Sequence, residues 1–63
     1  MDSRTIIRLI EADGWRFKAA VGSHYQFTHP HKKGRVTVQH PRKDVPVGTR
    51  KKIEQQAGIV LQR

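Results

Sequence analysis

Three short stretches of the chain alternate apolar and polar side chains, and they lie between two stretches whose apolar residues have helical spacing. Alternation with a period of two is typical of a β-strand that buries one face. The middle stretch, around residues 24–29, places Tyr25 and Phe27 on one face and His24 on the other. We predict that the two aromatic side chains face a core, so that the imidazole of His24 faces outward.

The flanking alternations predict two further strands. The first covers residues 15–21, and four apolar side chains are predicted to share its buried face: Trp15, Phe17, Ala19 and Val21. We interpret Trp15 and Phe17 as core residues and not as platforms for stacked bases, because both fit this alternation. The third strand covers residues 35–39. Short connections between the strands favour an antiparallel meander.

Apolar residues with helical spacing predict one helix before the strands and one after them. The first helix runs from about residue 3 to residue 13, with Asp2 or Ser3 as its N-cap. The second helix begins near residues 46–49 and stops at Gly58. The predicted fold class is therefore α+β, with the element order helix, three strands, helix.

A chain of 63 residues allows one small domain, which we assign to residues 1–63. The apolar tail at residues 59–61 is predicted to pack on its core or on another chain. The sequence has no cysteine, so neither a disulfide nor a cysteine-based metal site is expected. Charged residues interrupt the apolar residues near the N-terminus, and we therefore predict no signal peptide, no membrane contact and a cytoplasmic location.

The net charge of +8 is concentrated in the middle of the chain. The segment from Gly14 to Lys43 holds seven basic residues, all four histidines and no acidic residue, whereas the flanks together hold six basic and five acidic residues. A positive field confined to one segment suggests a face for a polyanion such as a nucleic acid. A surface that only keeps the protein in solution is the alternative interpretation of the same charges.

Four motifs in a fixed order resemble those of a known family: Gly22-Ser23-His24 before an aromatic strand, Val36-Thr37-Val38 leading into His40-Pro41, Pro46-x-Gly48-Thr49, and Ile53 to Gly58. The chain resembles the HicA toxins of HicA–HicB toxin–antitoxin systems over nearly its whole length. The resemblance implies a fold like the double-stranded RNA-binding domain, with an antiparallel three-stranded sheet and two helices packed on one face. It also implies ribonuclease activity on messenger RNA, which blocks translation, and neutralisation by a HicB-like antitoxin. Direct DNA binding is expected of the antitoxin and not of this chain.

Cleavage of RNA requires a group that moves protons and groups that stabilise extra negative charge on phosphorus. We assign the first role to His24, as a general acid or base that works near neutral pH. Gly22 supplies the backbone freedom of the turn before it. Six further residues are predicted to contact RNA: Ser23, Lys32, Lys33, Arg35, Arg42 and Lys43. Whether the attacking oxygen is the 2′-hydroxyl of the substrate or water stays open.

Two other classes of function fit the same residues. A noncatalytic RNA-binding module of the same fold would carry the same charge, and a small interaction protein would use its basic surface for an acidic protein partner. From the pattern alone, His24 is also an ordinary solvent-facing strand residue. His29-Pro30-His31 and His40 suggest a metal site, but no carboxylate or cysteine lies between them, so we predict no metal and no cofactor.

Overall fold

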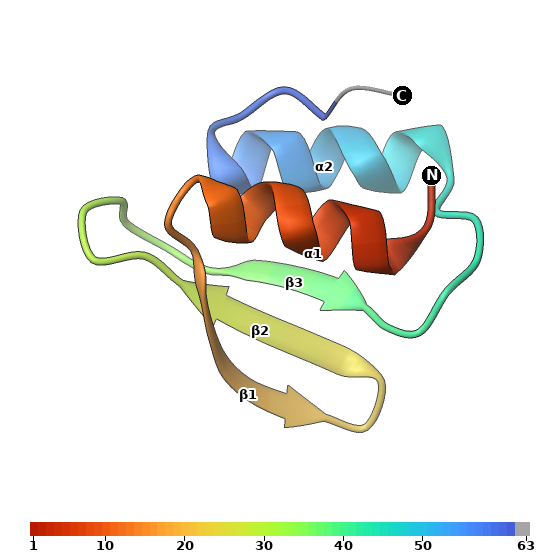
Figure 1. The fold of residues 1–63 in the computed structure, drawn as a ribbon, viewed down its shortest axis with the longest axis horizontal. Helices are drawn as coiled ribbons and strands as arrows, with labels where there is room; N and C mark the ends of the chain where they lie inside the picture. Colours follow the sequence, from red (N-terminus) through yellow and green to blue (C-terminus); the bar gives the residue numbers. More distant parts are fainter. Residues whose placement is uncertain (62–63) are drawn as a thin grey trace.

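The computed structural model describes residues 1–61, and five elements follow one another in the predicted order. They are α1 (Ser3–Ala12), β1 (Arg16–Val21), β2 (His24–Thr28), β3 (Val36–Gln39) and α2 (Val47–Ala57). The strands form one antiparallel sheet in the order β1-β2-β3, and both helices lie on the same side of it (Figure 1). The predicted α+β class and element order are therefore confirmed. The last two residues of the predicted domain, 62–63, lie outside the described residues.

One hydrophobic core lies between the helices and the sheet. The sheet contributes Phe27, Val36 and Val38, which cross-strand pairing places on a common face. The helices and connecting segments contribute the other buried apolar side chains: Ile6, Ile10, Trp15, Val45, Ile53, Ala57 and Leu61. Leu61 is 6% exposed and belongs to this cluster, and Ile59 packs against it, so these two residues of the predicted tail pack on the core of their own chain; Val60 between them is 72% exposed. Within the described residues, the opposite face of the sheet carries no helix.

The start of α1 and the end of α2 follow from the sequence. Asp2 is the N-cap of α1, and its carboxylate accepts a hydrogen bond from the backbone N–H of Thr5 at 2.9 Å. Hydrogen bonds from Thr5 lower the pKa of Asp2, because they favour the charged carboxylate. At the end of α2, Gly58 has φ +70° and its N–H donates to the carbonyl of Glu54 at 2.8 Å. Neither α1 nor α2 is long and apolar enough to cross a membrane.

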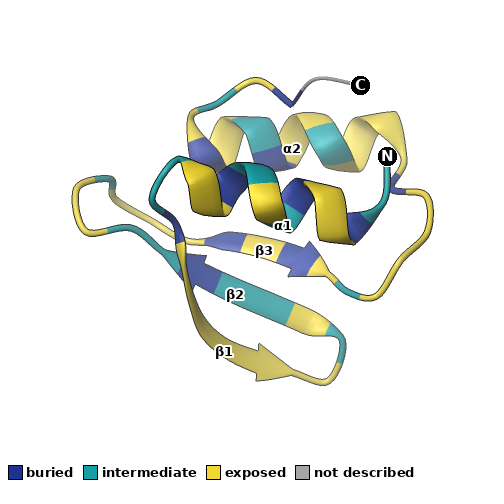
Figure 2. Cartoon of the chain, in the orientation of Figure 1, coloured by how far each residue is buried: buried dark blue, intermediate teal, exposed yellow. Residues whose placement is uncertain are grey.

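Strand β1 differs from its predicted burial. Trp15, just before the strand, is 1% exposed as predicted, but all six residues of β1 are exposed, including Phe17 at 54% and Val21 at 67% (Figure 2). Phe17 pairs with Phe27 and Ala19 with Gln26, so Lys18 is an extra residue in a β-bulge. The prediction of one buried face was wrong for two reasons: the bulge reverses the alternation, and the helices pack mainly over β3 at the other edge of the sheet.

Candidate nucleic-acid interface

His24 lies on the face of the sheet that carries no helix. It is the first residue of β2, with Val21 opposite it on β1 and Gln39 opposite it on β3. The next residue, Tyr25, pairs with Val38, whose side chain is in the core, so the side chain of His24 points the other way. Its exposed imidazole is accessible to a large ligand lying across the sheet. The predicted outward orientation is confirmed.

The turn before His24 is tied to the end of β3. Gly22 has φ +60°, and a Cβ at this position would meet no atom within 4 Å. The glycine is therefore required for the backbone conformation and not for lack of space. The carbonyl of Ser23 accepts a hydrogen bond of 2.8 Å from the backbone N–H of His40. This bond connects the hairpin turn to the segment that carries Arg42.

Two arginine–glutamine pairs lie on the same face as His24. Arg42 Nη1 donates to Gln39 Oε1 at 3.0 Å, and Gln39 is the cross-strand partner of His24. Arg35 Nη1 donates to Gln26 Oε1 at 2.9 Å, and Gln26 follows His24 by two positions on β2. Each glutamine thus holds a guanidinium group beside the face that carries the imidazole. Guanidinium groups bind phosphate oxygens through paired hydrogen bonds.

The predicted RNA-binding residues fall at two ends of the sheet. Ser23, Arg42 and Lys43 lie at the same end of the sheet as His24, where β3 finishes. The loop that holds Lys32, Lys33 and Arg35 connects β2 to β3 at the opposite end (Figure 1). Four residue steps of β2 separate the two ends, about 13 Å at the usual rise of a strand. Only the first group therefore adjoins the imidazole of His24.

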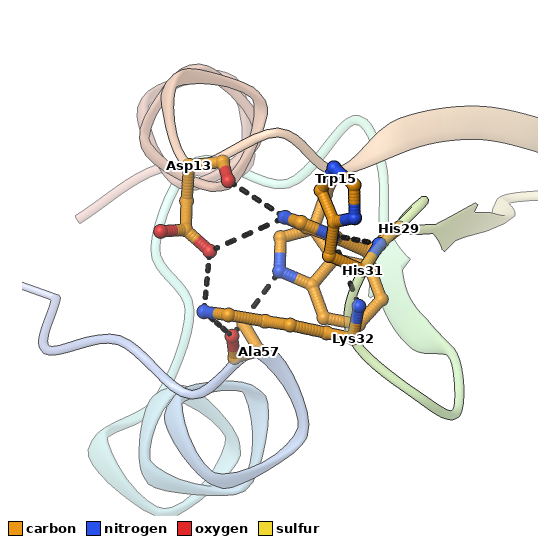
Figure 3. A network of polar contacts seen from close by, with 6 residues as sticks. All are labelled: Asp13, Trp15, His29, His31, Lys32 and Ala57. Carbon is orange, nitrogen blue, oxygen red and sulfur yellow. Dashed lines mark hydrogen bonds and ion pairs between the residues drawn. The ribbon is translucent and has the colours of Figure 1, made fainter.

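Lys32 has partners inside the protein (Figure 3). Its ammonium donates to Asp13 Oδ2 at 2.6 Å and to the carbonyl of Ala57 at 3.1 Å. The indole of Trp15 donates to the same carbonyl at 3.1 Å. These contacts join the end of α1, the β2–β3 loop and the end of α2. The structure gives Lys32 a role in holding the fold together that the sequence did not predict.

His29 belongs to the same network and does not resemble a metal ligand. Its Nδ1 accepts the backbone N–H groups of His31 at 2.9 Å and Lys32 at 3.2 Å. The proton of the neutral ring is therefore assigned to Nε2, which donates to the carbonyl of Asp13 at 2.8 Å. The ring also packs edge-on against Trp15. Within residues 1–61, no three histidine or acidic side chains are grouped as metal ligands.

Asp13→Asn is expected to lower the melting temperature at neutral pH. The hydrogen bond and charge of Lys32 lower the pKa of Asp13 in the folded state. This contribution to stability is present above the unfolded-state pKa and is lost as the pH falls through the lowered folded-state pKa. The melting temperatures of the variant and the wild type should therefore converge in acid, as followed by circular dichroism. Glu11→Gln, at an exposed carboxylate of α1, is the control and should show no such difference.

Comparisons with known proteins point to one family. The family profile described as "HicA toxin of bacterial toxin-antitoxin" matches residues 3–59. A chain of the solved "HicA3 and HicB3 toxin-antitoxin complex" has a TM-score of 0.84 and 32% sequence identity to this chain, covering 98% of this chain and 100% of the other. A comparison with curated proteins found no significant match. The matched region includes the Gly22-Ser23-His24 turn and both arginine–glutamine pairs.

Proposed function

Because the chain belongs to the HicA family of toxins from bacterial toxin–antitoxin systems, we propose that it is a ribonuclease that cleaves messenger RNA and thereby blocks translation in the cytoplasm. The observation that supports this most directly is the position of His24. Its exposed imidazole lies on an open sheet face, and the guanidinium groups of Arg35 and Arg42 bond to glutamines of the same face. An acid–base group and phosphate-binding cations on one accessible face are the groups that phosphodiester cleavage requires.

In the proposed mechanism, the RNA backbone crosses the helix-free face of the sheet near the Gly22-Ser23 turn. Arg42 binds the phosphate oxygens and stabilises the negative charge that grows on phosphorus during attack. His24 takes the proton of the attacking oxygen or gives a proton to the leaving oxygen. Arg35, Lys33 and Lys43 hold neighbouring parts of the backbone. Gly22 and Ser23 set the position of the imidazole through the turn.

We further propose that a HicB-like antitoxin neutralises this chain by covering the helix-free face. The proposal is supported by the similarity to a chain from a HicA3–HicB3 complex. A protein seated on this face would remove His24, Arg35 and Arg42 from contact with RNA in one step. It would also neutralise a positive surface if its own contact residues are acidic.

The test of the proposed activity is cleavage of a long single-stranded RNA by the purified chain in the presence of a metal chelator. We expect RNA fragments to accumulate, because the proposed chemistry uses protein side chains for both proton transfer and charge stabilisation. RNA binding is measured on the same samples at several salt concentrations. Salt-sensitive binding without any cleavage would favour the noncatalytic RNA-binding module, and absence of binding would favour an acidic protein partner.

A further inference from the structure

A small pocket lies beside the start of α1, at the same end of the sheet as His24. Its volume is about 180 Å³. Three basic residues line it, from two separate segments: Arg4 from α1, and Arg42 and Lys43 from the segment after β3. Among residues 1–61, Asp2 is the one carboxylate in the lining, and it already accepts the N–H of Thr5 as the helix cap. The lining therefore has a net positive charge.

Hydrogen bonds between α1 and the segment after β3 fix the walls of this pocket. Ser3 is 1% exposed, and its Oγ accepts the backbone N–H of Arg42 at 2.9 Å. The same Oγ lies 2.6 Å from His40 Nδ1. The backbone N–H of Ser3 donates to the carbonyl of Arg42 at 2.9 Å. Because these bonds exist within the protein, the pocket is formed before any ligand binds.

The pocket adjoins the face that carries His24 through Arg42. Arg42 lines the pocket, and its side chain donates to Gln39, the cross-strand partner of His24. His40, which forms another part of the wall, bonds through its backbone to Ser23, the residue before His24. Arg42 therefore connects the wall of the pocket to the face that carries His24.

We propose that this pocket binds a backbone phosphate of the RNA, adjacent to the phosphate cleaved at His24, and that Arg4 is one of its contacts. The inference rests on the proposed function, because it assumes that RNA lies across the sheet. Arg4, Arg42 and Lys43 present only hydrogen-bond donors, and a phosphate diester presents only acceptors there. Arg4 lies outside the basic middle segment, so the charge distribution along the sequence did not indicate it.

The test measures RNA affinity as a function of salt in the His24→Ala background, so that cleavage does not interfere. Arg4→Gln should weaken binding several-fold and reduce the slope of log K against log salt by about 0.7, the value for one phosphate contact with a single strand. Arg8→Gln is the matched control, since it removes the same charge from an exposed position one turn further along α1. It should leave the slope unchanged.

Lys43→Gln, at a second exposed residue of the lining, should reproduce the effect of Arg4→Gln. Equal changes of the slope in Arg4→Gln and Arg8→Gln would mean that the overall positive charge attracts the RNA. That result would overturn the proposed phosphate site in the pocket. A second result would also overturn it: Arg4→Gln leaves the salt dependence of RNA binding unchanged but weakens binding of a HicB-like antitoxin. The occupant of the pocket would then be an acidic side chain of the antitoxin. Because binding is measured without cleavage, failure of the pocket is distinguishable from failure of the proposed nuclease activity.

Discussion

His24→Ala is expected to lower the rate of RNA cleavage by about 10²- to 10⁴-fold, the usual contribution of one general acid or base. The imidazole is exposed on the helix-free face, so its removal leaves no cavity in the core. The melting temperature and the affinity for RNA should therefore stay close to those of the wild type. The measurement is the initial rate of cleavage of one RNA substrate, with thermal unfolding and RNA binding recorded on the same preparations.

His31→Ala is the matched control for this prediction. His31 is also an exposed histidine of the basic segment, but it lies in the β2–β3 loop at the far end of the sheet. Its backbone N–H makes the hydrogen bond to His29, and truncation of its side chain preserves that bond. We expect wild-type cleavage. Equal rates for His24→Ala and the wild type would remove His24 from the mechanism and point to a contaminating nuclease or to another catalytic group.

The sequence predicted those features of the candidate site that depend on residues close together along the chain. The alternation from His24 to Thr28 determines which side chains face outward, and Gly22 marks the turn before them. The contacts of Gln39 with Arg42 depend on how β3 pairs with β2, which no local pattern specifies. The sequence therefore indicated a basic face around His24 but not the glutamines that position its arginines.

Lys32 is a second residue whose contacts depend on distant parts of the sequence. As a basic residue in a basic segment, it was predicted to contact RNA. The structure brings Asp13 and the carbonyl of Ala57 to its ammonium from positions 19 and 25 residues away in the sequence. Charge counted along a chain gives the sign of a surface, but only the fold decides which cations are already paired. The prediction that Lys32 contacts RNA stays untested.

The alternating pattern did not distinguish the buried aromatic residue of the first predicted strand from the exposed one. The sequence treats Trp15 and Phe17 alike, because they are two positions apart in an alternating stretch. Trp15 is 1% exposed and donates to Ala57, whereas Phe17 is 54% exposed on the edge strand. Alternation identifies the face of a strand, but it carries no information about how far the helices extend over that face.

Trp15→Ala is expected to destabilise the domain by about 3–5 kcal/mol, the range for removal of a large buried aromatic side chain. Small domains have a free energy of unfolding near the lower end of about 5–15 kcal/mol, so much of the variant should be unfolded at 37 °C. Loss of the hydrogen bond from the indole adds little to this destabilisation, because the carbonyl of Ala57 still accepts a hydrogen bond from the ammonium of Lys32. Urea unfolding followed by circular dichroism measures the change.

Phe17→Ala is the control and should cost about 1 kcal/mol, because Phe17 contacts only the rings of Tyr25 and Phe27 among aromatic side chains of residues 1–61. The ratio of the two losses of unfolding free energy tests whether burial, and not aromatic character, decides how much each side chain stabilises the domain. Similar losses for both variants would mean that β1 is covered in solution by another protein or a second copy of the chain. In that case the loss for Phe17→Ala should diminish as the protein is diluted, whereas the loss for Trp15→Ala should not change with concentration.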